Sequence, residues 1–170
     1  MASYYFDANA LLKYSILQDY KSWYETPEKG ISEIKNLVTQ EDNIIFYSSL
    51  SLLESWSVIF RCYRGDILGK KPKNKNKALQ RIINQLQIEL QQAHFARLDT
   101  NINETTLIQA NRLIERYGIT NDVGTLDMVH IALIKQSTIN NLIMVSSDKV
   151  VKMICQKEII NIFDPQSIEI

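Results

Sequence analysis

The 170-residue sequence predicts a three-layer α/β fold around a central, mainly parallel sheet of about five strands. Short runs of β-branched and aromatic residues alternate along the chain with longer segments in which apolar residues recur at helical spacing. Parallel strands need long connections, and the helices that supply these connections cover both faces of the sheet. A domain typically has ~100–200 residues, so we expect one domain over 1–170.

The first half of the chain contains two apolar runs typical of strands, each followed by a segment of helical periodicity. Ser48 or Ser49 can cap the helix after the second run, because a serine hydroxyl accepts a hydrogen bond from the first turn of a helix. The apolar residues of this helix predict a buried face made of Leu53, Trp56, Phe60 and Tyr63. The expected elements are strands at 4–6 and 43–47 and helices at 8–14, at 28–40 and from the serine cap to about Arg64.

A break in the pattern follows at 65–77, where two glycines, one proline and five lysines predict a lysine-rich, solvated loop. The alternation of helices and strands resumes after this loop, and Thr125 can cap one of the later helices. The expected elements are helices at 78–92, 104–117, 125–135 and 148–156 and strands at 95–98, 142–146 and 159–163.

The composition is that of an ordinary globular protein and excludes the collagen-like and disordered classes. Basic and acidic residues both number 19, so binding to nucleic acid would depend on a local patch. Two cysteines, Cys62 and Cys155, are too few for a disulfide scaffold and predict free thiols in a reducing cytoplasm. The N-terminus lacks the features of a secretion signal, and no apolar run approaches the ~20 residues that cross a membrane.

Four carboxylates fall where an open α/β sheet binds ligands, beyond the carboxyl ends of its strands. Asp7 directly follows the first strand, and Asp148 follows the strand at 142–146. Glu54 lies in the first turns after the second strand, and Asp127 lies in the first turn of a later helix. Each aspartate alone could simply complement a helix dipole. Their equivalent placement in one predicted sheet instead indicates a shared site.

A cluster of four carboxylates needs a cation, because each close pair costs about 4 kcal/mol at a separation of about 4 Å and an effective dielectric constant near 20. The sequence has no His/Cys cluster with the spacing of a zinc site, whereas oxygen ligands suit Mg²⁺ or Mn²⁺. These cations also bind phosphate oxygens. The chemistry predicted from the residues is therefore metal-assisted phosphodiester hydrolysis.

Four short strings resemble, in chain order, the acidic motifs of PIN-domain ribonucleases, and the nearest branch is the VapC-type toxins of bacterial toxin–antitoxin pairs. The resemblance extends over essentially the whole chain, so it implies a single PIN-like domain. Because each motif is short and degenerate, its specificity comes from motif order and strand placement. The strings are FDANALL at 6–12, SLSLLE at 49–54, DMVHIAL at 127–133 and VSSD at 145–148.

The resemblance implies an endoribonuclease that depends on Mg²⁺ or Mn²⁺. It assigns metal binding to the four acids Asp7, Glu54, Asp127 and Asp148, and it places Asn9 and Ser146 at polar positions that support the first and the last of them. It also implies a homodimer and a small antitoxin partner. The exposed candidates for these interfaces are Trp23, Tyr24 and the helix near Leu86 and Leu90.

Several features keep alternatives open. The lysines Lys70, Lys71, Lys73, Lys75 and Lys77 are either a solvated face or contacts for RNA phosphates. His130, one turn after Asp127 on an apolar helix, is expected to be packed or hydrogen-bonded, and not to form a proton shuttle with His94. A PIN fold that only binds or regulates is one rival function. A haloacid-dehalogenase-like phosphatase is another, although Asn9 cannot supply the acid that follows the phosphoryl-accepting aspartate in that family.

Overall fold

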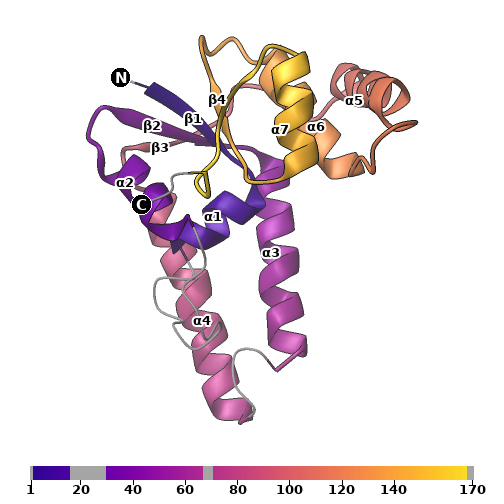
Figure 1. Ribbon diagram of the computed structural model, residues 1–170. Helices are drawn as coiled ribbons and strands as arrows, with labels where there is room; N and C mark the ends of the chain where they lie inside the picture. Colours follow the sequence, from indigo (N-terminus) through magenta and orange to yellow (C-terminus); the bar gives the residue numbers. More distant parts are fainter. Residues whose placement is uncertain (1, 16–29, 67–70, 168–170) are drawn as a thin grey trace.

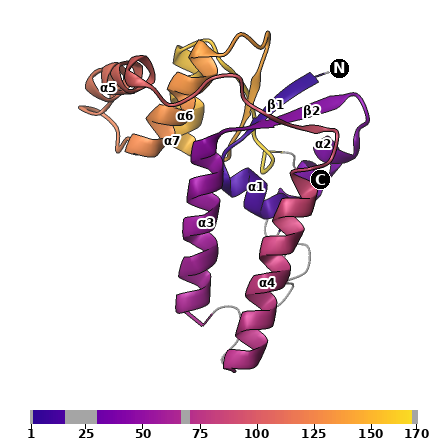
Figure 2. The same ribbon diagram turned by 180° about the vertical axis from the view of Figure 1, so that it is seen from behind.

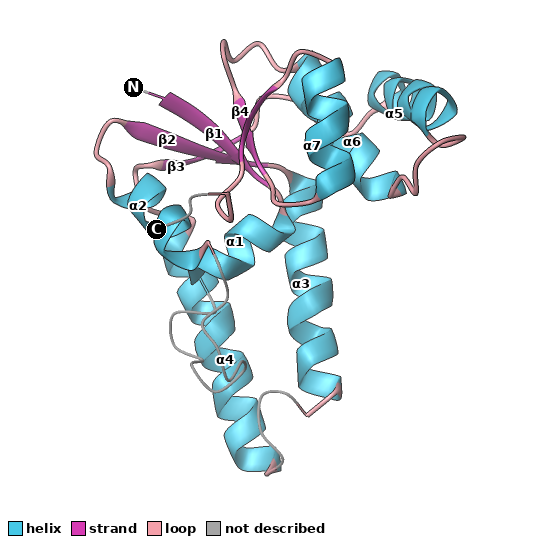
Figure 3. Cartoon of the chain, in the orientation of Figure 1, coloured by secondary structure: helices cyan, strands magenta, loops and turns pink. Residues whose placement is uncertain are grey.

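The computed structural model describes residues 2–15, 30–66 and 71–167 and confirms the predicted three-layer α/β/α fold (Figures 1 and 3). Within these ranges, five strands alternate with seven helices in nearly the predicted order. The strands are β1 (Ala2–Phe6), β2 (Asn43–Tyr47), β3 (Phe95–Arg97), β4 (Ile143–Val145) and β5 (Asn161–Phe163). The helices are α1 (Ala8–Ser15), α2 (Ile31–Thr39), α3 (Ser49–Arg64), α4 (Pro72–Glu89), α5 (Glu104–Tyr117), α6 (Thr125–Gln136) and α7 (Lys149–Lys157).

The sheet is parallel throughout and has the order β3-β2-β1-β4-β5. Chain order therefore reverses between β1 and β4. The last residue of β1, Phe6, pairs with the last residues of both neighbouring strands, Tyr47 and Val145. The carboxyl ends of the strands consequently lie in one row, and the β1/β4 junction is the position where such sheets bind ligands.

Successive residues of β1 point to opposite faces of the sheet and enter two cores. Tyr5 faces α5, α6 and α7, and Phe6 faces α1 and α2. Helix α6 lies deepest, with every residue from Met128 to Ile134 buried. The two faces are thus covered by different sets of helices, as expected for parallel strands joined by helical crossovers.

Helices α3 and α4 form a hairpin that extends away from the sheet (Figures 1 and 2). A small core of its own, made of Ile59, Ile82 and Leu86, holds the two helices together, and Leu12 of α1 packs against this core. Leu86, which the sequence proposed for an interface, is therefore an internal residue of the hairpin. Leu90 is half-buried against the same core, and Trp23 and Tyr24 lie outside the described residues.

The lysine-rich loop predicted over 65–77 is wrong in its second half, because α4 begins at Pro72. Proline is favoured in the first turn of a helix and lysine is a good helix former, so both extend the helix toward its N-terminus. Lys73, Lys75 and Lys77 therefore lie on α4. Residues 67–70, which include Lys70, lie outside the described part of the chain.

The predicted buried face of α3 is also wrong. Leu53 and Phe60 are 67% and 41% exposed, and Trp56 and Tyr63 are only half-buried. Small hydroxyl side chains let α3 approach the end of β1 closely, because the protein satisfies their hydrogen bonds internally. The residues that α3 buries are Leu50, Ser51, Ser55 and Ile59.

Two further predictions concern cysteines and membranes. Cys62 and Cys155 are both free, as the sequence predicted, and Cys155 is buried. In the described ranges, no helix combines the length and the apolar character needed to cross a membrane.

Candidate active site

The structure brings the four predicted acids to the carboxyl end of the sheet. Asp7 lies between β1 and α1, and Asp148 immediately precedes α7 after the end of β4. These two residues flank the β1/β4 junction. Glu54 lies on α3, which begins one residue after β2, and Asp127 lies in the first turn of α6.

The negative charges of these acids act on one another. Burial, followed by the charge of Asp148, raises the pKa of Asp127 from 3.8 to about 6, and Asp7 and Glu54 act in the same direction. Burial also raises the pKa of Asp7 above its ordinary value, although a hydrogen bond from the Ala10 amide favours its charged form. The four carboxylates therefore share one electrostatic site, whose excess negative charge favours binding of a proton or a cation.

Two of the acids also cap helices. Asp7 Oδ1 accepts a hydrogen bond from the Ala10 amide at 2.8 Å. Asp148 Oδ1 accepts hydrogen bonds from the amides of Val150 and Val151 at 2.8 and 2.9 Å. These contacts stabilise the first turns of α1 and α7. The sequence left two explanations of these aspartates open: that they complement a helix dipole, or that they form a shared site. Both explanations apply to Asp7 and Asp148.

Asn9 and Ser146 lie beside the acids that they were predicted to support. Ser146 is buried after the end of β4, and its Oγ accepts a hydrogen bond from the Asp148 amide at 3.2 Å. Asn9 is exposed on the first turn of α1. Both residues line a small cavity together with Asp7. The geometry thus gives Ser146 a direct contact with the loop of Asp148 and places Asn9 at the rim of the site.

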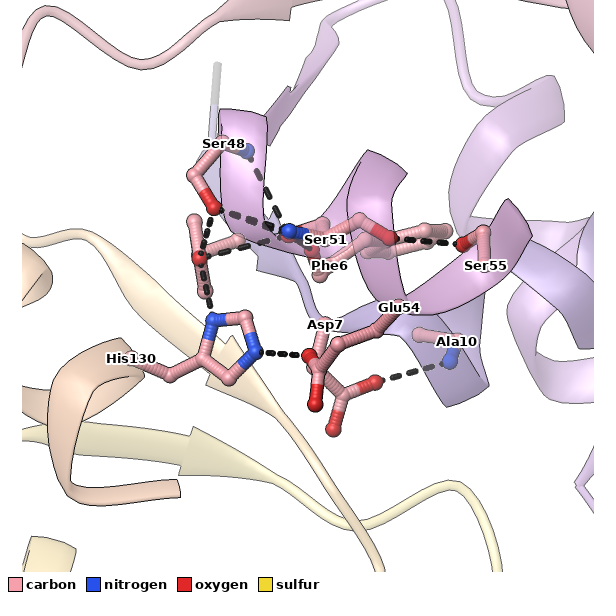
Figure 4. Close-up of polar contacts among 9 residues, drawn as sticks. Phe6, Asp7, Ala10, Ser48, Ser51, Glu54, Ser55 and His130 are labelled. Carbon is pink, nitrogen blue, oxygen red and sulfur yellow. Dashed lines mark hydrogen bonds and ion pairs between the residues drawn. The ribbon is translucent and has the colours of Figure 1, made fainter. Parts of the chain in front are cut away.

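Glu54 is bound to a buried histidine that lies one turn after Asp127 on α6 (Figure 4). Glu54 Oε2 lies 2.6 Å from His130 Nε2, and His130 Nδ1 lies 2.6 Å from Tyr5 Oη. The chain of contacts continues from Tyr5 to Ser48 Oγ at 2.8 Å and to Ser51 Oγ at 3.3 Å. His130 is therefore hydrogen-bonded, as the sequence predicted.

The sequence predicted that His130 is packed or hydrogen-bonded, but it did not predict which residues contact it. Ser48 and Ser51 form the capping box of α3, and Ser51 Oγ donates to the Phe6 carbonyl at 2.9 Å. The same serines that begin the helix therefore hold the end of β1 next to Asp7. The spacing of Asp127 and His130, three residues apart on one helix, is the sequence signal that places both on one side of α6.

The carboxylate of Asp127 packs against the backbone of Gly124. A Cβ atom built on Gly124 would lie 2.3 Å from Asp127 Oδ2, which is far inside van der Waals contact. Any larger residue at 124 would therefore displace this carboxylate. Gly124 has an extended backbone conformation, so a larger residue here would meet the Asp127 side chain and would not strain the backbone.

As the side chains stand, no three His, Cys, Asp or Glu residues in the described ranges form a group that could hold a metal ion. Asp7, Glu54 and Asp148 each direct one carboxylate oxygen toward a protein group. A carboxylate has a second oxygen, and such oxygens are the ligands that Mg²⁺ and Mn²⁺ prefer. The donor set therefore fits these cations chemically, and a cation would bind by drawing the side chains together. Figure 4 shows the carboxylates of Asp7 and Glu54 pointing toward the same region.

The predicted RNA-binding lysines differ in their surroundings. Lys71, Lys73 and Lys77 are exposed, whereas Lys75 forms an ion pair with Asp66 and lies 4.5 Å from the centroid of the Tyr63 ring. Of the 19 basic residues of the chain, eight lie between Glu54 and Glu89, together with one of the 19 acids. The hairpin is therefore strongly basic, and the rest of the chain is acidic.

A scan against protein-family models finds no match for the chain, and a search of curated proteins finds no relative. The fold and the site alone define the class: a parallel α/β protein with four acids at the point where strand order reverses.

Proposed function

We propose that the chain is an endoribonuclease of the PIN-domain type that depends on Mg²⁺ or Mn²⁺, similar to the VapC-type toxins. The observation that carries this proposal is the electrostatic coupling of four carboxylates at the carboxyl end of the sheet, where burial first and then the neighbouring acids raise the pKa of Asp127 to about 6. Such coupling is unfavourable for the isolated protein. A site of this kind is retained in a fold when a bound cation or substrate uses it.

The residues have distinct roles in this proposal. Asp7, Glu54, Asp127 and Asp148 would hold the cation through carboxylate oxygens. When bound, a divalent cation lowers the pKa of a water molecule and stabilises the oxygen that leaves the phosphodiester. Ser146 orients the Asp148 loop through its hydrogen bond, and Asn9 lies exposed at the small cavity beside Asp7, where it could contact a substrate bound over the acids.

RNA is the proposed substrate because the basic hairpin lies next to the acidic site. Glu54 belongs to the same helix as Arg61 and Arg64, so α3 runs from the acids into the basic region. Lys71, Lys73 and Lys77 are exposed there. Cations of this kind bind phosphates of the RNA backbone and would offset the repulsion between RNA and the four acids.

We also propose a cytoplasmic homodimer that is inhibited by a small antitoxin, on the basis of the motif resemblance. The free thiols of Cys62 and Cys155 suit a reducing compartment. Leu53 and Phe60 on α3 and Ile88 on α4 are exposed apolar residues that a protein partner could cover. A monomer at micromolar concentration in light scattering would contradict the dimer, and harmless overexpression without a partner would contradict the toxin.

The test of the proposed function is cleavage of labelled RNA by the purified protein with Mg²⁺ or Mn²⁺. Asp7→Asn keeps the shape of the side chain and its capping oxygen but removes the charge, so we expect activity to fall about 100-fold or more. Asp122→Asn is the matched control, because Asp122 is an exposed acid five residues before Asp127. Its activity should equal that of the wild type.

Two outcomes would contradict the nuclease. One is cleavage that survives removal of divalent cations, and the other is full activity in Asp7→Asn. RNA binding without any cleavage would support the rival function of a PIN fold that only binds, so the assay is paired with filter binding of the same RNA.

A further inference from the structure

His130 is held rigidly between two parts of the chain that are far apart in sequence. The imidazole is 2% exposed and Tyr5 is fully buried. One ring nitrogen contacts Tyr5 Oη and the other contacts Glu54 Oε2, both at 2.6 Å. With a partner at each nitrogen, the ring cannot rotate or flip without losing both contacts. The orientation of Glu54 is therefore tied to that of Tyr5.

The Phe6 carbonyl determines the donor and the acceptor in each hydrogen bond of this network. A carbonyl oxygen can only accept, so the Ser51 hydroxyl donates to it. Ser51 then has no hydrogen left, and the Ser48 hydroxyl donates to Ser51 Oγ at 3.1 Å. Tyr5 in turn donates to Ser48 Oγ. Each hydroxyl thus passes its hydrogen toward the carbonyl of β1.

This direction decides how Tyr5 faces His130. The phenol of Tyr5 has a single hydrogen to donate. That hydrogen is directed to Ser48, and the phenol oxygen is left to accept from His130 Nδ1. The contact of 2.6 Å between His130 Nε2 and Glu54 Oε2 must then contain a proton as well, because two lone pairs at that distance repel.

We propose that His130 is a positioning residue for Glu54: anchored by Tyr5, it holds one carboxylate oxygen so that Glu54 presents only Oε1 to a ligand of the acidic site. The part of this proposal that involves a cation depends on the proposed function, whereas the hydrogen bond between His130 and Glu54 does not depend on it. Residues that orient metal ligands in this way raise metal affinity, and their loss typically weakens binding by about 10–100-fold.

The first test reads the hydrogen bonds without any metal or substrate. The chain has two histidines, His94 and His130, so protein labelled with ¹⁵N-histidine gives two sets of imidazole signals, assigned with His94→Gln. In metal-free protein at pH 7, we expect His130 to carry a slowly exchanging proton on Nδ1 and a strongly deshielded proton in the contact with Glu54. Tyr5→Phe should remove the protection at Nδ1.

A spectrum in which His130 Nδ1 carries no proton would overturn the proposal, because Tyr5 would then donate its hydrogen to His130 instead of accepting one from it. Rapid exchange at both nitrogens would overturn it as well. Both outcomes leave the proposed nuclease untouched, since they do not involve the cation.

The second test measures Mn²⁺ affinity by calorimetry. His130→Leu removes both contacts and should weaken binding about 10–100-fold. His130→Gln can place an amide donor near the position of Nε2 and should recover most of the affinity, while the control His94→Gln should match the wild type. Tyr5→Phe is the milder variant, should His130→Leu fail to fold, and should weaken binding less than His130→Leu.

Equal Mn²⁺ affinity in the wild type and in folded His130→Leu or Tyr5→Phe would overturn the positioning role. If the wild type binds no Mn²⁺, the proposed function fails, and the imidazole signals still decide whether His130 anchors Glu54.

Discussion

The carboxylate of Glu158 and those of Asp7 and Asp127 in the acidic site have opposite electrostatic environments. Glu158, at the end of α7, accepts hydrogen bonds from Arg116 and Tyr117 at 2.7 and 2.6 Å and is also bound by Lys135. Burial alone would raise its pKa, but these donors outweigh burial and lower the pKa to about 2. In the acidic site, burial is the largest cause of the shifts of Asp7 and Asp127, and both pKa values are raised.

The difference separates a carboxylate with cationic partners from carboxylates whose charged forms are disfavoured by burial and by neighbouring acids. The partners of Glu158 come from α5 and α6, so the cluster joins three helices on one face of the sheet. In the acidic site, Glu54 contacts the imidazole of His130, and the buried Lys13 lines the cavity beside Asp7. Folding nevertheless disfavours the charged forms of Asp7 and Asp127, and bound divalent cations would reverse this effect.

The largest expected effect is an opposite pH response of the two groups in metal-free buffer. The pKa of Asp127 is raised to about 6, so its ionisation destabilises the folded state as pH rises from about 4 to 6. Because the side chain is partly exposed, screening by water keeps this cost well below the roughly 3 kcal/mol that the full shift would give. The pKa of Glu158 is lowered to about 2, so its contribution is complete above its unfolded pKa near 4.5 and is lost as pH falls toward 2. Thermal unfolding should therefore show maximum stability near pH 4–5.

Two variants show which residues cause each slope in the dependence of stability on pH. Asp127→Asn should reduce the slope between pH 4 and 6, where Asp7 also contributes, and leave the slope below pH 4 unchanged. Glu158→Gln should do the reverse. A wild-type profile that is flat between pH 4 and 6 would mean that neither burial nor the neighbouring acids disfavour the charged form of Asp127, which contradicts the comparison.

A smaller effect is expected from Glu158→Gln at neutral pH. The change leaves Arg116 and Lys135 without their carboxylate, but the Arg116 side chain is 62% exposed and is screened by water. We expect a loss of about 1–2 kcal/mol, seen as a decrease of roughly 3–6 °C in Tm by calorimetry. Asp122→Asn, on an exposed acid, is the control. An unchanged Tm in Glu158→Gln would show that this cluster does not stabilise the fold.

The smallest effect concerns the basic hairpin, which is distant from Glu158 in the fold. Replacing Lys71, Lys73 and Lys77 with Gln should raise the KM for RNA about tenfold, reduce its dependence on salt, and leave kcat nearly unchanged. A control variant removes three charges elsewhere by changing Lys35, Arg112 and Lys157 to Gln. Equal salt dependence in both variants would favour the alternative that the lysines are only a solvated face.

Periodicity was sufficient to predict the sheet and the order of its elements. The helix at 104–117 and the strand at 43–47 were predicted with the bounds that the structure has. The start of α4 was missed because lysines were interpreted as a sign of solvent exposure, and exposed lysines are equally compatible with a helix. The buried face of α3 was missed because apolar residues were assumed to face inward, whereas this helix buries serines that bond within the protein.

The acids of the site could be predicted because their positions follow from where strands end. The network that holds Glu54 could not, because it depends on contacts between distant residues: Tyr5 and His130 are 125 positions apart. Tyr5 has the sequence context of an ordinary core aromatic. Only the folded chain shows that its hydroxyl meets a histidine, and that this histidine meets an acid.

The central claim is that the four acids form a site for a divalent cation, and titration of metal-free protein with Mn²⁺ by isothermal calorimetry tests it most directly. We predict saturable binding to the wild type and to Asp122→Asn, and a loss of that binding in Asp7→Asn, because the amide keeps the cap of α1 and removes a charge from the site. The absence of saturable binding in the wild type, or equal binding in Asp7→Asn, would contradict the claim.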